Sequence, residues 1–349
     1  ELTSVIREEL IETQEIYGDE RRTEIVEFYS DLTDEDLIPE EDLIVTLSKT
    51  GYAKTQPLDT YQAQNRGGTG KRAASLKDED FVSKLFVANT HDTLLCFSSY
   101  GKVYWIKVYR LPRGGRNAKG RPIVNLLPLE KDERIQAVLP VKEFNDDQFI
   151  FMATESGSVK KTKLSAYSRP MKSGIKAIKL REGDRVVNAE ITDGSKEIML
   201  FSNSGKSIRF KETDARPMGR VSQGVRGMRI EKDQRIISLV VLEEGNILVA
   251  TENGFGKQTS KDEFSIQKRG GKGVIAIQTS KRNGNLIGAN QVRTGDEVMF
   301  ISTTGNLIRT RTDDISVIGR NTQGVKLIRL SEDDNLLGME KVISEDDEE

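Results

Sequence analysis

Hydrophobic residues occur in short runs along most of the chain, and glycine, asparagine, aspartate or serine separates one run from the next. Glu197–Asn203 (EIMLFSN) is one such run, and Ser204-Gly205 follow it. Runs rich in valine, isoleucine and phenylalanine with this punctuation predict β-strands joined by tight turns. We expect a positive φ at the turn glycine, because hairpin turns require it and glycine adopts it without strain.

The strand and turn pattern repeats six times. The turn glycine recurs at intervals of 50, 56, 48, 49 and 51 residues. A second glycine follows it by 19 residues in five repeats and by 17 in the third. Self-similarity at a fixed period is the signature of a repeat architecture. The first series is Gly51, Gly101, Gly157, Gly205, Gly254 and Gly305, and the second is Gly70, Gly120, Gly174, Gly224, Gly273 and Gly324.

Each repeat predicts four short strands. In the fourth repeat they are Glu197–Asn203, Ser207–Glu212, Val225–Ile230 and Ile236–Leu242. In the sixth they are Glu297–Thr303, Leu307–Thr312, Val325–Leu330 and Leu336–Val342. One such unit cannot bury both its faces, so six of them are expected to stack radially into a propeller-like, all-β disc. The pattern leaves open how the strands connect and whether the disc is flat or spiral.

The ends of the chain differ from the repeats. Val5-Ile6, Leu10-Ile11 and Ile16-Tyr17 follow helical spacing, so we expect a helix and a charged linker over residues 1–40. The β domain is expected over 41–342, followed by the start of an acidic tail at 343–349. Its expected blades are residues 41–90, 91–145, 146–194, 195–245, 246–295 and 296–342.

The net charge of -2 conceals a strong asymmetry. Residues 1–42 carry a net charge of -13 and residues 345–349 carry -5, whereas residues 43–344 carry +16. A basic body between acidic ends predicts a polyanionic partner, with the ends able to compete for the same surface.

Basic residues follow the repeat, which indicates a cationic rim. Within the second strand of a repeat Arg209 and Lys211 share one face, as do Arg309 and Arg311, because side chains alternate. Ordinary solvated strand faces are the alternative for any single residue. Aromatic residues make up 6% of the chain and none recurs among the basic ones, which favours duplex backbone contact over base stacking. The candidate rim residues are Lys54, Lys71, Arg72, Lys107, Arg116, Lys119, Lys160, Lys172, Arg209, Lys211, Arg220, Lys257, Lys268, Arg269, Arg309, Arg311 and Arg320.

The residues that usually carry chemistry are scarce. Cys96 is the only cysteine and His91 the only histidine, which excludes a disulfide framework and a four-ligand Cys/His zinc site. A single cysteine suits a reducing cytoplasm, and no run approaches the ~18 apolar residues of a membrane span. The glycine-rich stretches at 67–72 and 268–273 lack the spacing of a phosphate-binding P-loop. We expect no catalytic, metal or cofactor site in this chain.

Gln64–Gly70 reads QNRGGTG and resembles the gyrase A box, a motif usually written QRRGGKG. Asn65 replaces an arginine and Thr69 a lysine, whereas Gln64, Arg66, Gly67, Gly68 and Gly70 match. The stretches EDLIVTL (41–47), ANTHDTLLCFS (88–98), RPIVNLLPL (121–129) and IGRNTQGV (318–325) also resemble gyrase. The sequence is therefore similar, over essentially its whole length, to the C-terminal DNA-wrapping domain of bacterial gyrase A proteins.

The resemblance implies a six-bladed β-pinwheel, in which a strand is exchanged between blades. It implies positive wrapping of duplex DNA around a basic rim, within an A2B2 complex of the gyrase A and gyrase B proteins. ATP, magnesium and the DNA-cleaving tyrosine would then belong to other parts of that complex. The expected setting is the cytoplasm, in association with the nucleoid.

Three other classes of protein share parts of this pattern. The matching C-terminal domain of topoisomerase IV has fewer blades and a degraded box, which six repeats and QNRGGTG argue against. A propeller used as a protein-interaction scaffold would not need a body of net charge +16. A propeller enzyme acting on glycans would need clustered carboxylates in its central channel, and none recurs at the strand starts.

Overall fold

The computed structural model describes residues 2–19, 23, 34–48, 51–58, 82–115, 118–304, 307–331 and 334–342. The chain divides into two units, Glu1–Pro39 and Glu40–Glu349. The first contains α1 (Leu2–Tyr17), whose described side chains are all exposed, and the 3-10 helix η1 (Asp34–Leu37). The helix expected near the start of the chain is thus present, and it ends where Gly18 donates its N–H to the Gln14 carbonyl.

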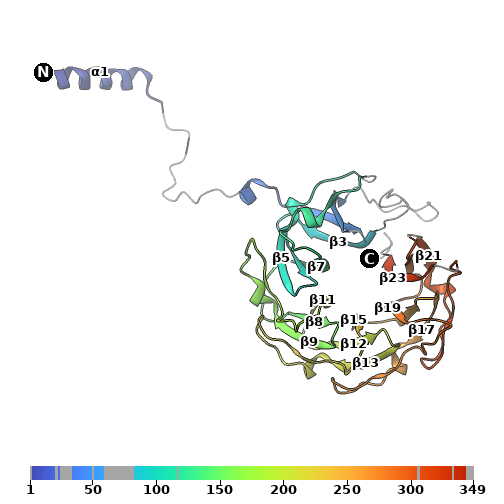
Figure 1. The fold of residues 1–349 in the computed structure, drawn as a ribbon. Helices are drawn as coiled ribbons and strands as arrows, with labels where there is room; N and C mark the ends of the chain where they lie inside the picture. Colours follow the sequence, from blue (N-terminus) through green and yellow to red (C-terminus); the bar gives the residue numbers. More distant parts are fainter. Residues whose placement is uncertain are drawn as a thin grey trace. The chain divides into compact units, whose positions relative to one another are not determined.

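The second unit consists of six antiparallel sheets arranged as the blades of a propeller (Figure 1). This confirms the fold expected from the six repeats. In each blade the first strand is central, the second lies outside it and the third lies nearest the middle of the ring. In chain order these strands are β1 (Asp42–Ser48), β2 (Tyr52–Pro57) and β3 (Val82–Asn89); β4 (Thr93–Ser98), β5 (Lys102–Lys107) and β7 (Ile135–Val141); β8 (Phe149–Thr154), β9 (Ser158–Lys163) and β11 (Val186–Thr192); β12 (Glu197–Ser202), β13 (Lys206–Lys211) and β15 (Ile236–Leu242); β16 (Asn246–Thr251), β17 (Phe255–Ser260) and β19 (Leu286–Val292); and β20 (Glu297–Ser302), β21 (Leu307–Arg311) and β23 (Leu336–Val342).

The outermost strand of a blade comes from the next repeat. These exchanged strands are β6 (Arg121–Pro122), β10 (Ile175–Lys176), β14 (Val225–Arg226), β18 (Val274–Ile275) and β22 (Val325–Lys326). For example, β14 pairs with β9 of the third blade, although it follows β13 of the fourth in sequence. The exchange implied by the family resemblance is therefore confirmed. Within the described residues the sixth sheet has three strands, in the order β21-β20-β23.

The exchanged strands are shorter than the sequence predicts. Residues 225–230 were expected to form one strand, but only Val225–Arg226 do so. The next two residues, Gly227 and Met228, instead donate their N–H groups to the carbonyl of the turn glycine Gly157. The chain thus bends over the hairpin of the preceding blade, which ends the strand.

The turn glycines have the expected left-handed backbone. Five glycines of the first series lie in the described part of the chain, and their φ angles range from +74° to +86°. The second series is equally constrained, since a Cβ on Gly224 would lie 2.4 Å from the Val159 carbonyl oxygen. These glycines therefore let the exchanged strand approach its neighbour closely.

The hydrophobic core lies between blades. On β12, Ile198 and Leu200 pack toward the third blade, whereas Met199 and Phe201 pack toward the fifth. A central strand with a neighbour on each face is apolar at consecutive positions, which explains the uninterrupted runs of the sequence. Five such clusters join successive blades from the first to the sixth in the described residues.

Candidate nucleic-acid interface

The structure describes most, but not all, of the candidate rim residues. The box Gln64–Gly70 lies outside the described residues, as do Lys71, Arg72 and Arg116. The box occupies the part of the first repeat that corresponds to the loops before β6, β10, β14, β18 and β22. Its role therefore stays a prediction.

Lys54, Lys160 and Lys257 are buried, with 3%, 0% and 0% of their surface exposed. Each lies three residues after a turn glycine, whereas Arg209 and Arg309 lie four residues after theirs. Adjacent strand residues point to opposite faces, so the two sets do not share a surface. The expectation that these three lysines contact DNA is therefore corrected: as placed here, their ammonium groups face protein.

The buried ammonium groups bind backbone carbonyls, and each has at least one acceptor in the following repeat. Lys257 Nζ donates to the carbonyls of Gly319 at 2.5 Å and Arg320 at 2.6 Å, and to Thr322 Oγ1 at 3.0 Å. Lys160 Nζ donates to the carbonyls of Ala177 at 2.5 Å and Arg220. A buried charge requires such partners, because leaving it unpaired is very unfavourable.

Lys54 makes a longer contact of the same kind. Its Nζ lies 3.3 Å from the Gly115 carbonyl oxygen of the second blade. All three lysines thus connect an outer strand to a loop of the next blade.

The position after these lysines forms a second row of contacts between blades. Arg209 Nη1 donates to the Lys261 and Phe264 carbonyls at 2.7 and 3.0 Å, and its Nε donates to Glu197 Oε2 at 2.7 Å. Only 12% of its side chain is exposed. Arg209 therefore joins the fourth blade to the fifth, and its expected role as a phosphate contact is also corrected.

Other blades place different donors at the Arg209 position. They are Thr55, Trp105, Lys161 and Gln258, whose side chains reach the carbonyls of Pro112, Tyr167, Glu212 and Thr312 at 3.5, 2.9, 3.4 and 2.6 Å. Most of the acceptors lie in or beside the 3-10 turns η3 (Val108–Arg110), η5 (Leu164–Tyr167), η6 (Glu212–Asp214), η7 (Lys261–Glu263) and η8 (Thr312–Asp314). The shared position thus joins blades regardless of side-chain charge.

Other candidate cations reach the surface. Lys211 and Arg311 are exposed at the ends of their strands, and Arg309, exposed in the middle of β21, pairs with Glu297. Lys107 is half-buried and donates to the His91 carbonyl at 2.9 Å. In the loops, Lys119, Lys172 and Lys268 are exposed, and Arg220, Arg269 and Arg320 are half-buried.

The exchanged strands carry exposed cations that the sequence reasoning missed. Counted from the second glycine of a repeat, they occupy the second and fifth positions. They are Lys176, Lys179, Arg226, Arg229, Lys326 and Arg329, and all six are exposed. Counting from the second glycine instead of the first reveals this register. These side chains lie on the outermost strands or directly after them, where a duplex following the rim would pass.

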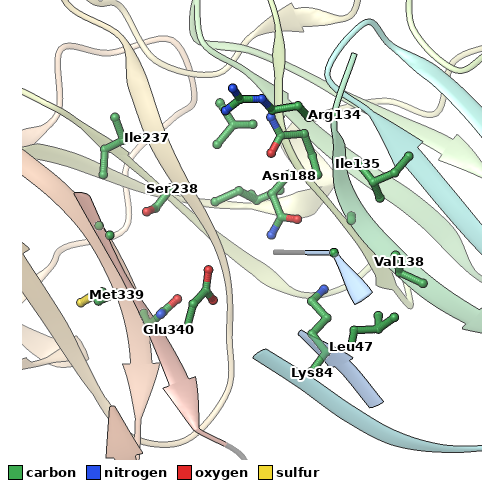
Figure 2. Close-up of a pocket in the computed structure, with 18 of the residues that line it drawn as sticks. Leu47, Lys84, Arg134, Ile135, Val138, Asn188, Ile237, Ser238, Met339 and Glu340 are labelled. Carbon is green, nitrogen blue, oxygen red and sulfur yellow. The ribbon is translucent and has the colours of Figure 1, made fainter. Parts of the chain in front are cut away.

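The middle of the ring contains a cavity of about 610 Å³ (Figure 2). Side chains from the innermost strands line it, and Lys84, Asn188 and Glu340 point into it. Glu190 and Glu340 contribute carboxylates from the third and sixth blades, which the search at strand starts missed. Glu340 has interaction partners within the protein.

Cys96 and His91 have the side chains most often used in catalysis and metal binding, but here both have structural surroundings. Burial raises the pKa of the Cys96 thiol to about 12, so the thiolate is scarce at neutral pH. His91 Nδ1 lies 3.6 Å from Glu40 Oε1. Among the described residues, no three His, Cys, Asp or Glu side chains gather in a manner suited to a metal ion. No helix in that part of the chain is long and apolar enough to cross a membrane.

The chain resembles known proteins along its whole length. The DNA gyrase A protein of Salmonella typhimurium is 53% identical over 349 residues, which cover all of this chain and 40% of the relative. The DNA gyrase A protein of Escherichia coli K12 is 52% identical over 334 residues, or 95% of this chain and 38% of the relative. The chain thus spans about two fifths of the length of these relatives.

Solved structures share the fold. The C-terminal domain of DNA topoisomerase IV has a TM-score of 0.78 at 28% identity, and the match covers 87% of this chain and 94% of that one. A DNA gyrase A C-terminal domain has a TM-score of 0.66 at 28% identity, covering 87% and 100%. The family described as "DNA gyrase C-terminal domain, beta-propeller" matches at 42–89, 92–142, 148–193, 196–243, 245–293 and 296–343. One match per blade, together with these relatives, shows that the chain belongs to the DNA gyrase A C-terminal domain family.

Proposed function

We propose that this chain binds duplex DNA along the outer edge of its blades, without sequence specificity, and bends it into a positive wrap. The observation that carries the proposal is the repeated placement of exposed cations on the exchanged strands. Lys176, Arg226 and Lys326 occupy the same position in three repeats, and Lys179, Arg229 and Arg329 occupy another. Spaced cations of one sign match the phosphate backbone and need no base contact.

The size of the disc and its charge support wrapping over a local contact. A body of about 300 residues has a radius near ~25 Å by globular scaling. Bending ~30 bp of duplex through ~180° around it costs on the order of 10 kcal/mol of elastic energy. Several phosphate contacts along the rim must offset this cost, and the surplus of 16 positive charges in residues 43–344 supplies them.

The proposed setting is gyrase. In it, the wrap presents a neighbouring DNA segment for strand passage, so that the A2B2 complex introduces negative supercoils. DNA cleavage belongs to the remainder of the gyrase A protein, and the ATP and magnesium sites belong to the gyrase B protein. The chain itself contributes neither catalysis nor a cofactor site, and it acts on nucleoid DNA in the cytoplasm.

The topoisomerase IV domain is the nearest alternative, since its fold superposes with a TM-score of 0.78. Sequence favours gyrase, because gyrase A proteins reach 53% identity, although the solved topoisomerase IV and gyrase A domains are each 28% identical to this chain. A protein-interaction scaffold is the alternative from another class, and it would leave the exposed cations without a role.

Two measurements test the proposal. Binding to linear duplex should weaken steeply as salt rises and depend little on sequence, because released counterions drive it. Nicked circles ligated in the presence of the chain should acquire a positive change in linking number. A flat response to salt would favour the scaffold, and binding without a linking change would refute wrapping.

A further inference from the structure

The blades alternate between two kinds of outer strand. The third residue after the turn glycine is a lysine in the first, third and fifth blades, at Lys54, Lys160 and Lys257. In the second, fourth and sixth blades it is Tyr104, Ile208 and Ile308. The chain is therefore built of three pairs of blades as well as six single repeats.

The loops that follow alternate in step with these strands. Five and four residues before the second glycine, the second, fourth and sixth repeats have Gly-Arg: Gly115-Arg116, Gly219-Arg220 and Gly319-Arg320. The other repeats have Asn65-Arg66, Arg169-Pro170 and Lys268-Arg269. A lysine in one blade thus always accompanies Gly-Arg in the next, three times within one chain.

The structure gives the physical link between the two features. Lys257 Nζ donates to the carbonyls of Gly319 and Arg320, and Lys160 Nζ donates to the carbonyl of Arg220, the residue equivalent to Arg320. Lys54 Nζ reaches the carbonyl of Gly115, which is equivalent to Gly319. Each ammonium therefore holds the backbone of the Gly-Arg pair itself.

In the fourth blade, where Ile208 stands in place of the lysine, the contact is apolar. A Cβ built on Gly271, in the loop of the fifth blade, would lie 3.5 Å from Ile208 Cδ1. The backbone bonds that dock a loop on the preceding strand occur in both kinds of blade, for example from Met218 N–H to the Lys161 carbonyl and from Gln267 N–H to the Arg209 carbonyl. The lysine ammonium is thus found in only one kind of blade, whereas the loop of the fifth blade is held in part by Arg269, which donates to the Asp214 and Arg226 carbonyls at 2.8 and 3.0 Å.

We propose that Lys54, Lys160 and Lys257 are positioning residues, each of which pins an arginine-bearing loop of the next blade so that pinned and unpinned loops alternate along the rim. The contribution of these lysines to DNA binding rests on the proposed function. Arg220 and Arg320 would then be presented in fixed positions by a lysine of the preceding blade, whereas Lys172 and Lys268 belong to loops without this contact, and Arg269 is itself bonded to the Asp214 and Arg226 carbonyls. A rim of this kind sets the path of the DNA at every second blade.

Lys160→Met tests the pin because methionine fills similar volume without a charge. Replacing a buried charge by an apolar side chain of similar size often preserves folding. Lys163→Met is the matched control, since Lys163 lies on the same strand β9 and is exposed. Hydrogen exchange of the full chain should speed up in residues 217–224 of the Lys160→Met protein and stay unchanged in 316–324. Lys257→Met should give the reverse, and equal exchange in all variants would overturn the pin.

A double-mutant cycle tests the effect on DNA. Arg220→Ala should weaken duplex binding and lower the salt slope by about one. If Lys160 acts through Arg220, then Lys160→Met combined with Arg220→Ala binds as Arg220→Ala alone. Lys163→Met combined with Arg220→Ala should instead show the sum of the two single effects. Additive losses with Lys160→Met would show that Lys160 acts independently and overturn the positioning role.

Failure of the proposed DNA-binding function would give a different result. DNA binding would then be insensitive to Arg220→Ala, whereas hydrogen exchange would still show that Lys160 holds the loop.

Discussion

At the scale of single residues, the packing of the next blade decides which cations face solvent. Ile208 and Phe210 of β13 are buried, Arg209 donates to the Lys261 carbonyl of the next blade, and Lys211 is exposed. One face of this strand therefore contains a structural cation two residues away from one that faces solvent. Charge periodicity by itself does not separate these roles.

The exposed cations missed by sequence reasoning give the first prediction. Arg226→Ala and Arg229→Ala should each weaken duplex binding for all sequences and lower the salt slope by about one, because each removes one phosphate contact. Titrations at several salt concentrations measure this. Lys232→Ala is the control, since Lys232 is exposed in the turn that leads toward the innermost strand β15. Equal losses in all three variants would argue for a diffuse field in place of a defined path.

Lys160 also gives a prediction about pH. Burial, with a smaller effect of the Arg220 guanidinium, lowers the pKa of Lys160 to about 7 from the ordinary value of 10.5. Between these values the unfolded chain binds more protons than the folded one, so the free energy of unfolding should rise with pH. The rise is at most about 1.4 kcal/mol per pH unit. Urea titrations from pH 7 to 10 should show this slope in the wild type relative to Lys160→Met. If the free energies of unfolding of the two proteins change in parallel with pH, the pKa of Lys160 is close to its ordinary value.

At the scale of elements, strand exchange joins successive blades. Each exchanged strand brings the chain of its own repeat against the β-hairpin of the preceding blade. The glycine in the turn of that hairpin allows this close approach. A Cβ on Gly205 would lie 2.2 Å from the Ile277 carbonyl oxygen, just beyond β18. The blades are therefore expected to unfold together, because the outermost strand of each four-stranded sheet comes from the next repeat.

Gly205→Ala should destabilise the protein by about 1–3 kcal/mol or more, because its φ of +77° is strained for alanine and the Cβ meets backbone. Denaturant unfolding measures the change. Gly219→Ala is the matched control, since Gly219 lacks a positive φ and nothing lies within 4 Å of its Cβ. The control should change stability by less than about 0.5 kcal/mol. Similar values for the two variants would refute the close-approach argument.

At the scale of the whole molecule, acidic segments flank a basic body. Residues 1–42 carry -13 and residues 345–349 carry -5, against +16 between them. Opposite charges on one chain compete with DNA phosphates for the same cations. Removing residues 345–349 should therefore tighten duplex binding at low salt, and the difference should fade at high salt as screening increases. Weaker binding after the deletion would contradict competition by these residues.

The box gives the second prediction at this scale. Gln64–Gly70 is one basic loop among six, so replacing it with alanines should leave tight binding, with a salt slope lower by about one. We expect bending to suffer more, because its glycines permit a close backbone approach to DNA and the family resemblance implies that the box lies where the first blade meets the last. The linking change on nicked circles should disappear. In the full enzyme, negative supercoiling should disappear while relaxation persists. Collapsed affinity with normal bending per bound molecule would contradict this role.

The amino-acid sequence alone was enough to establish the number of blades, the turns and the family. Glycines recur because hairpins demand a positive φ, and apolar runs recur because each central strand packs against two neighbours. These are local constraints, repeated six times, so the sequence shows them before any tertiary contact is known. The box QNRGGTG and the net charge of +16 in residues 43–344 likewise pointed to DNA before any geometry was known.

The three-dimensional structure was needed to show which blade receives each outer strand and which cations reach solvent. The exchange of β14 onto β9 joins residues far apart in sequence, so no local pattern specifies it. Lys160 and Lys211 are both lysines on outer strands, yet one binds backbone carbonyls, including that of Arg220 in the next repeat, and the other is exposed. Whether a side chain is buried depends on which residues of the next repeat pack over it. Sequence periodicity gives the position of a residue but does not show what packs over it.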